Sequence, residues 1–349
     1  MKTATRIEWV DVLKFLGIWA IYIGHFGELS GKLYSFVFLY HVPLFFFAAG
    51  LFAPRMAKDL FWVFVKQKAL QLMLPYAFFS ALAILIATFQ YGWGLAEVVS
   101  VLKSSLLGVR NTLQAATLWF IPCLYVVVIL DYVLLIILKS RMRNLFAAVI
   151  IFVISQTLLS GNPLLKPTWF MNIDSALYYY VYFAFGAVLL PCLNKDFSDP
   201  RVRSLQILLF IVAFLIATAS YFNGGSWLYE KIAPFLPLAY FFGLLPALMS
   251  VVCALILIYV NVVAAKTLAK VSFLGNLGRE TLIFCGTEDV LKLVLLQLFV
   301  MVGLKITFAS PLLVILFSLF CLVVSKYTLV VFLNTYFPVL VGKSRRVDF

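Results

Sequence analysis

The sequence predicts an all-α, polytopic membrane protein with about ten transmembrane helices and both termini in the cytoplasm. Three observations support this fold class. First, 64% of the 349 residues are hydrophobic and the mean hydropathy is +1.08, whereas an ordinary soluble domain is about 45–50% apolar. Second, apolar segments of about 17 to 28 residues recur along the chain, and about 20 such residues cross the hydrocarbon core of a bilayer as a helix. Third, Lys and Arg are concentrated in alternate loops, as in proteins whose loops lie on opposite sides of a membrane.

The apolar segments define ten predicted spans and leave little chain between them. The spans are residues 10–26, 34–52, 70–89, 115–138, 144–160, 175–191, 205–222, 233–260, 282–304 and 311–337. They are apolar on all sides, which excludes the alternating strands of an outer-membrane barrel. Three prolines, Pro234, Pro237 and Pro246, predict that the eighth span is kinked or split. The longest connection, residues 90–114, has only 25 residues, too few for a soluble domain, so we expect one membrane domain over residues 1–349.

The charge distribution predicts the topology. The chain carries 27 basic and 14 acidic residues, a net charge of +13. With the N-terminus in the cytoplasm, 18 of the loop Lys and Arg residues fall on the cytoplasmic side and six on the other. This asymmetry favours an even number of helices and two cytoplasmic termini. Because topology accounts for most of the positive charge, we expect membrane lipids and no nucleic acid as partners. The five cysteines stand singly, so we expect neither a disulfide nor a metal site.

One cytoplasmic loop is both basic and aromatic. Residues 53–69 contain Arg55, Lys66 and Lys68 together with Phe61 and Trp62. Two interpretations fit this pattern. The segment is an interfacial helix that anchors the cytoplasmic face, or it forms a basic rim for an anionic ligand such as a coenzyme phosphate.

The first span carries three titratable residues on one stripe. At 100° per residue, Lys14 and His25 differ by about 20° in direction, and Asp11 lies about 40° to the other side of His25. The helical rise separates Lys14 from His25 by about 16 Å, so the two side chains share a face without touching. Asp11 and Lys14 can form an ion pair three residues apart near the cytoplasmic interface. Since an imidazole accepts a proton near neutral pH, His25 is either the leading candidate for a base or a buried, hydrogen-bonded histidine.

Other ionisable groups at membrane depth have simpler interpretations. His41, the second of the two histidines, precedes Pro43 in the second span and fits core packing or a hydrogen bond to a neighbouring helix. In the ninth span, Glu288 and Lys292 are four residues apart and can pair, which leaves Asp289 in need of another partner. Lys326 in the tenth span must find a carboxylate or reach an interface.

Several stretches resemble the acyltransferase family 3 of integral-membrane O-acyltransferases. The opening RIEWVDVLKFLGIWAIYIGHF is similar to the family's first-helix pattern of an Arg, an Asp, a basic residue and, after ten others, a His, which are here Arg6, Asp11, Lys14 and His25. The second span, FVFLYHVPLFFFAAGLF, resembles the family's segment of Pro, Phe and Gly. Three further stretches, VKQKALQLMLPY, TLWFIPCLYVV and FLGNLGRETL, resemble later family motifs. The matches cover about the first 125 residues and recur near residues 275–282.

The sequence also departs from the family pattern. The family usually has Arg where Lys14 stands, and a lysine keeps the charge but lacks the two-pronged guanidinium. Gln71 stands where a second basic-motif Arg is usual, and the histidine that often follows the late Gly-Arg-x-Thr-Leu segment is absent, with Gly286, Thr287 and Glu288 in its place. These departures indicate a divergent branch.

The resemblance implies transfer of an acyl group, commonly acetyl, from cytoplasmic acyl-CoA to a hydroxyl of a carbohydrate, lipid-linked glycan or other cell-envelope acceptor in a bacterial cytoplasmic membrane. It makes His25 the general base, or a transient carrier of the acyl group. From the basic character of the cytoplasmic face, we expect Lys14, Arg55, Lys66 and Lys68 to lie near the phosphates of the acyl-CoA. Asp11, Glu288 or Asp289 would orient or balance the charges of the site. Two alternatives stay open: a transporter or glycan-lipid flippase that uses the intramembrane charges, and a catalytically inert relative that acts within an assembly.

Overall fold

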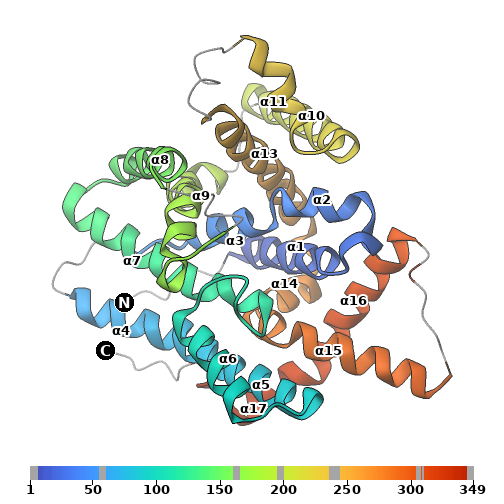
Figure 1. Cartoon of the computed structure of the whole chain (residues 1–349). Helices are drawn as coiled ribbons and strands as arrows, with labels where there is room; N and C mark the ends of the chain where they lie inside the picture. The colour runs from blue at the N-terminus through green and yellow to red at the C-terminus, as the bar shows by residue number, and fades with distance from the viewer. Residues whose placement is uncertain are drawn as a thin grey trace. The chain divides into compact units, whose positions relative to one another are not determined.

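The computed structural model describes residues 7–54, 60–159, 166–194, 200–235, 244–303, 308 and 310–343, and this part of the chain is built from helices without any β-strand (Figure 1). The all-α class is thereby confirmed. Helices are the expected outcome of long apolar segments, because a helix pairs its backbone polar groups internally where water is absent.

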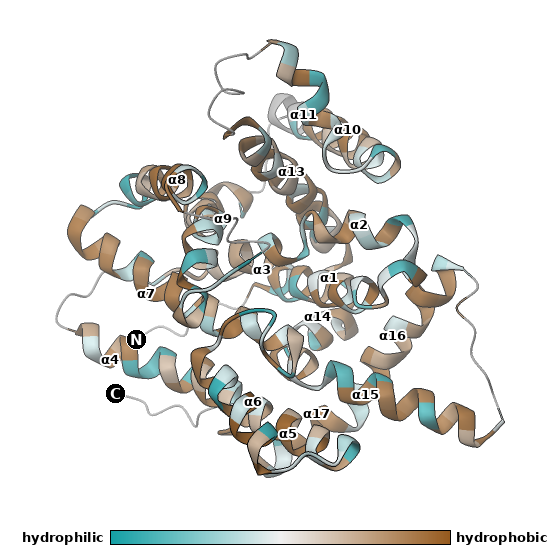
Figure 2. Cartoon of the chain, in the orientation of Figure 1, coloured by the Kyte–Doolittle hydropathy of each residue, from teal (hydrophilic) through white to brown (hydrophobic). Residues whose placement is uncertain are grey.

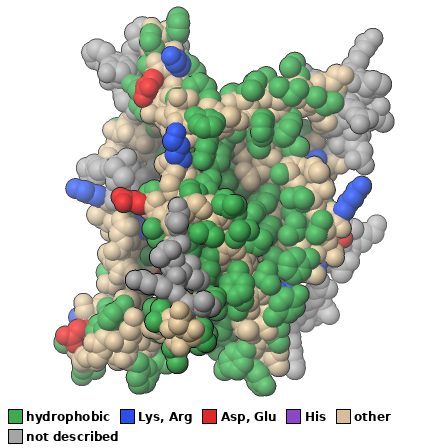
Figure 3. Space-filling model, turned by 90° about the vertical axis from the view of Figure 1, so that its right-hand side faces the viewer, with side chains coloured by type: hydrophobic (Ala, Val, Ile, Leu, Met, Phe, Trp, Pro, Cys, Tyr) green, Lys and Arg blue, Asp and Glu red, His purple; other side chains and the backbone are tan. Residues whose placement is uncertain are grey.

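Seven helical segments of the described chain are long and apolar enough to cross a membrane. They are Lys32–Gly50, Phe61–Tyr91, Ala116–Leu138, Phe170–Leu193, Gln206–Asn223, Leu244–Leu268 and Pro311–Tyr336. All seven overlap predicted spans. Hydropathy is high along these helices (Figure 2), and hydrophobic side chains make up most of the face in Figure 3. Phe89 and Met301, for example, are both 82% exposed. Such extensive apolar exposure is the property of an integral membrane protein.

The three other predicted spans are also helices, but they are shorter or more polar. Helices α1 (Glu8–Gly24) and α8 (Arg141–Thr157) have 17 residues each. Helix α15 (Thr281–Met301) has 21 residues and includes Glu288, Asp289 and Lys292. The count of ten spans and the cytoplasmic position of the termini therefore stay predictions. In the eighth predicted span, a short 3-10 turn (Ala233–Phe235) and helix α13 (Leu244–Leu268) flank residues 236–243, which lie outside the described residues.

The chain divides into two compact units, each assembled from three separate segments. Unit 1 comprises residues 1–52, 185–281 and 307–323. Besides α1 and α13 it contains α2 (Lys32–Phe38), α3 (His41–Gly50), α10 (Pro200–Asn223), α11 (Trp227–Ile232), α14 (Ser272–Gly278), the end of α9 (Ile173–Leu193) and most of α16 (Pro311–Tyr327). Helix α1 lies at its centre and packs against α2, α3, α13 and α14. The helix that carries the predicted site is thus the core of unit 1.

Unit 2 comprises residues 53–184, 282–306 and 324–349. A continuous helical run is formed by α4 (Phe61–Lys68), a π-helical turn (Ala69–Met73) and α5 (Leu74–Tyr91). The other helices of the unit are α6 (Leu95–Leu107), α7 (Phe120–Leu138), α8, the first part of α9, most of α15, and α17 (Leu329–Tyr336), with short 3-10 turns at Ala116–Trp119 and Phe170–Asn172. Helix α5 packs against α6, and α7 packs against α8 and the π-helical turn.

The contact between α1 and α14 depends on one glycine. A Cβ atom built on Gly278 would lie 1.7 Å from the carbonyl oxygen of Asp11, so only a residue without a side chain lets the two backbones approach this closely. One turn earlier in α14, a Cβ on Gly275 would meet nothing nearer than a methyl group of Val12 at 4.0 Å.

We expect Gly278→Ala to lower the free energy of unfolding by about 1–3 kcal/mol or more, because the added methyl group forces α14 away from α1. The matched variant Gly275→Ala should be neutral or slightly stabilising, since alanine favours a helix over glycine. Thermal unfolding in detergent measures both. Equal melting temperatures for the two variants would contradict the close contact at Gly278.

Candidate functional site

The charged end of α1 holds a carboxylate between two cations. Asp11 is only 6% exposed. Its Oδ1 lies 2.9 Å from Nζ of Lys14, and its Oδ2 lies 3.6 Å from Nε of Arg279, which follows α14. The predicted pair between Asp11 and Lys14 is confirmed. The side chains of Lys14 and Arg279 are 28% and 38% exposed, so this cluster of one anion and two cations offers accessible positive charge.

The sequence did not reveal Arg279 as the third member of this cluster. Arg279 belongs to the stretch FLGNLGRETL, and Asp11 and Lys14 belong to the opening motif. The ion pair and the contact of Gly278 with the backbone of Asp11 bring these two distant motifs together. The presence of both motifs in one chain was the available signal.

His25 lies at the other end of α1, where the helix stops. It is the C-cap residue, its backbone N–H donates to the carbonyl of Ile21 at 2.9 Å, and its side chain is exposed. The alternative of a buried histidine is therefore wrong. The eleven-residue separation places His25 about 16 Å from Lys14 along the helix, so the structure does not bring the imidazole into the charged cluster. An exposed imidazole is open to a substrate.

His41 has a structural setting. It is 3% exposed, and its Nδ1 donates to the carbonyl of Val37 at 2.7 Å. Phe38 meets the imidazole edge to face, with the ring centroids 4.7 Å apart. These contacts agree with the expectation of packing and hydrogen bonding, which leaves His25 as the accessible histidine of the two in the chain.

The acidic pair of α15 is divided between two environments. Glu288 is 1% exposed and forms an ion pair with Lys292 one turn along the same helix, which confirms the predicted pairing. Asp289 is exposed. Because successive residues of a helix point about 100° apart, the buried ion pair and the exposed carboxylate occupy different sides of α15.

The basic loop forms a short helix in unit 2. Helix α4 ends with Lys66, which is exposed, and Lys68, which is half-buried and donates to Oε1 of Gln71 at 3.1 Å. Trp62 of this helix is 77% exposed. An exposed tryptophan beside lysines fits the interfacial interpretation, and the exposed ammonium of Lys66 leaves the phosphate interpretation open. Arg55, the fourth predicted phosphate-binding residue, lies outside the described residues.

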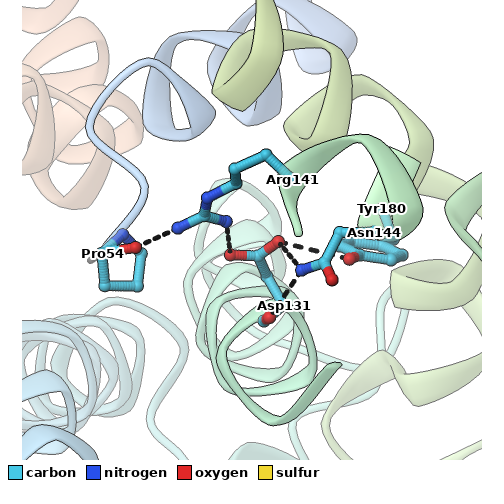
Figure 4. Close-up of polar contacts among 5 residues, drawn as sticks. All are labelled: Pro54, Asp131, Arg141, Asn144 and Tyr180. Atoms are coloured by element: carbon cyan, nitrogen blue, oxygen red, sulfur yellow. Dashed lines mark hydrogen bonds and ion pairs between the residues drawn. The ribbon is translucent and has the colours of Figure 1, made fainter. Parts of the chain in front are cut away.

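A buried polar network around Asp131 was missed by the sequence reasoning (Figure 4). Asp131 of α7 is completely buried, and its Oδ2 lies 2.6 Å from Nη1 of Arg141 on α8. Its Oδ1 accepts hydrogen bonds from Nδ2 of Asn144 at 3.1 Å and from the hydroxyl of Tyr180 at 3.2 Å. Arg141 also donates to the carbonyl of Pro54. The missed signal was a single carboxylate inside the apolar segment 115–138.

A second polar cluster in unit 2 joins two loops for which the sequence predicts a position on the outer face. Asn172 is fully buried, accepts from the backbone N–H of Arg110 at 2.7 Å and donates to the carbonyl of Trp119 at 3.3 Å. The guanidinium of Arg110 lies 4.7 Å from the ring centroid of Trp119. Asp174 accepts from the backbone N–H groups of Thr168 and Trp169. These contacts fix the loop that enters α9.

Comparisons with known proteins identify the family. The family model described as an acyltransferase domain matches residues 7–278. This range includes Asp11, Lys14 and His25, and it ends at the glycine that packs against α1. Comparison with curated proteins finds no match, and comparison with solved structures finds none. The family match covers more than three quarters of the chain and supports acyltransferase activity. The chain therefore belongs to acyltransferase family 3.

Proposed function

We propose that the protein is an O-acyltransferase of a bacterial cytoplasmic membrane. It moves an acyl group, in the first instance acetyl, from cytoplasmic acyl-CoA to a hydroxyl group. The acceptor that carries this hydroxyl is a carbohydrate, a lipid-linked glycan or another cell-envelope molecule. One observation carries this proposal. Helix α1 lies within the family-matched region. It has accessible cations at one end, at Lys14 and at Arg279, which directly follows the matched region, and an exposed imidazole at the other end, at His25. Cations suit the phosphates of a coenzyme, and an imidazole suits the activation of a hydroxyl.

In this proposal His25 is the general base. Its neutral imidazole takes the proton of the acceptor hydroxyl while the hydroxyl oxygen attacks the carbonyl carbon of the thioester. The carbon–sulfur bond then breaks, and the imidazolium returns the proton to the departing CoA thiolate. The products are an ester and free CoA, and the imidazole is neutral again. The reaction needs no metal ion.

The donor would be held through its phosphates by Lys14. The basic loop of unit 2, with Arg55, Lys66 and Lys68, stays a separate phosphate-binding prediction from the sequence. Asp11 acts through its neighbours, because its two carboxylate oxygens face Lys14 and Arg279 separately and thereby position both cations. The carboxylate of Glu288 balances the positive charge of Lys292, its ion-pair partner in α15. Under the predicted topology, the charged end of α1 and the bound donor lie on the cytoplasmic side.

We expect Lys14→Ala to raise the KM for acyl-CoA by about tenfold or more, because a charge-assisted contact to phosphate is lost. Lys14→Arg should retain most of the activity, because it keeps the charge and can still reach Asp11. The matched control is Lys32→Ala, which removes an exposed lysine from unit 1 on the predicted outer side. Steady-state kinetics with acetyl-CoA measures all three. Inactivity of Lys14→Arg would show that the lysine has a role other than its charge.

The proposed reaction can be followed by the release of CoA thiol from acetyl-CoA by the purified protein in nanodiscs, with and without a crude extract of envelope glycans. We expect thiol release that depends on the extract. Binding of acetyl-CoA without any release would favour the inert relative, and the absence of both binding and release would favour the transporter.

A further inference from the structure

Unit 2 contains a cavity that the proposed reaction has not yet used. Its volume is about 210 Å³, and it lies between the end of α5, residues 114–117 and one face of α15. Five polar residues contribute to its lining: Gln90, Tyr91, Gln114, Thr117 and Asp289. Gln90, Tyr91 and Asp289 are exposed, whereas Thr117 is buried. The cavity thus has a polar, accessible mouth and a closed floor.

The floor is held by contacts between segments that are far apart in sequence. The hydroxyl of Thr117 donates to the carbonyl of Cys285 at 2.7 Å, and the thiol of Cys285 approaches the carbonyl of Thr117 at 3.6 Å. Beside them, a Cβ atom on Gly286 would lie 2.3 Å from the ring of Phe79, so α15 and α5 touch at this point. The cavity is therefore a fixed part of unit 2.

Asp289 and Glu288 lie on different sides of α15, and only the side with Asp289 borders the cavity. Gly286, Asp289 and Leu293 recur at intervals of three and four residues, which places them on one side of α15. Glu288 lies on another side and is neutralised by Lys292. Of the two adjacent acids, Asp289 is the one that lines the cavity.

The chemistry of the lining favours a polyhydroxylated ligand. A carboxylate accepts hydrogen bonds, and the two primary amides of Gln90 and Gln114 both donate and accept, which matches the hydroxyl groups around a sugar ring. The ring of Tyr91, which stacks on Trp93 at 5.9 Å, gives the mouth an aromatic wall. A phosphate is disfavoured, since the described lining residues include Asp289 and neither Lys nor Arg.

The cavity opens to the surface at Gln90 and Tyr91, which are both exposed. A sugar ring bound beside Asp289 can therefore belong to a longer glycan that extends out past these two residues.

We propose that this cavity binds one sugar ring, with the Asp289 carboxylate accepting hydrogen bonds from ring hydroxyls and the amides of Gln90 and Gln114 bonding to others. The further claim that this sugar ring belongs to the acyl acceptor rests on the proposed function. The claim that the cavity binds a sugar ring is independent of it.

Binding of simple glycosides tests the cavity without any acyl transfer. The probes are the methyl glycosides of glucose, galactose, rhamnose and N-acetylglucosamine, observed by saturation-transfer NMR with the full-length protein in nanodiscs. We expect at least one of them to bind. Asp289→Asn in α15 and Gln114→Ala in the segment 114–117 should each weaken its affinity by about tenfold. The matched control Glu97→Gln removes an exposed carboxylate from α6 of the same unit and should leave the affinity unchanged.

The outcomes distinguish this inference from the proposed function. A glycoside that binds the wild type and is weakened by both cavity variants supports the sugar site, even if no acyl transfer is ever observed. Acyl transfer to a glycan without binding of any probe, or with the same affinity in wild type and both variants, overturns the sugar site and leaves the transferase intact.

Discussion

His25→Ala is expected to lower the rate of acyl transfer by about 10²–10⁴-fold, the usual contribution of a general base. The reason is that alanine cannot take the proton of the acceptor hydroxyl, and the described α1 offers no second imidazole in its place. Since the His25 side chain is exposed at the end of the helix, its removal should change the free energy of unfolding by no more than about 0.5 kcal/mol. The initial rate of CoA release and the melting temperature in detergent together separate the two effects.

Two further variants test whether the lower rate of His25→Ala comes from the loss of a base. His25→Gln keeps a polar side chain but has no group that is basic near neutral pH, so it should be as inactive as His25→Ala. Glu28→Gln alters an exposed residue three positions further on and should retain the wild-type rate. Full activity of His25→Ala in folded protein would exclude His25 as the base.

Asp131→Ala is expected to give the largest loss of stability, about 3–5 kcal/mol, because removing one partner of a buried ion pair leaves the other charge uncompensated. Asp131 is fully buried, and the guanidinium of Arg141 and the side chains of Asn144 and Tyr180 all point to its carboxylate (Figure 4). Without it, α7, α8 and α9 lose their common polar contact. Thermal unfolding of the purified protein in detergent measures the effect as a lower melting temperature.

The control for Asp131 is an exposed arginine two residues beyond its partner. Arg143 donates to the carbonyl of Leu138 at the surface, so Arg143→Ala should change the stability little. The double variant Asp131→Ala/Arg141→Ala should cost less than the sum of the single variants, because the unpaired charge is removed as well. A melting temperature of Asp131→Ala equal to that of the wild type would show that the network does not stabilise unit 2.

The sequence predicted those site contacts that helix geometry alone determines. The Asp11–Lys14 and Glu288–Lys292 pairs join residues three and four positions apart, and both formed as expected. The helical class and the approximate positions of the helices within the ten predicted spans followed from the length of the apolar segments, whereas α6 and α14 lie between these spans. The number of helices that cross the membrane did not, because α1, α8 and α15 are too short or too charged to be assigned by length and composition.

Contacts between distant segments could not be predicted in the same way. Arg279 meets Asp11 only because Gly278 lets α14 lie against α1. The Asp131 network depends on how α7, α8 and α9 pack, and a single acid in an apolar segment does not reveal its partner. The separation of Asp289 from Glu288 was implicit in the 100° helical step, but the face of α15 that borders a cavity is decided by α5 and residues 114–117.

The most direct test of the central claim is the fate of the acyl group itself. Purified protein in nanodiscs is incubated with acetyl-labelled CoA and an envelope-glycan extract, and label on the glycan is measured before and after mild alkali, which cleaves oxygen esters and leaves amides intact. Our account predicts that label appears on the glycan, is released by alkali, and is missing when His25→Ala replaces the wild type. Label that resists alkali, or a glycan that stays unlabelled while wild-type protein binds acetyl-CoA, would contradict O-acyl transfer.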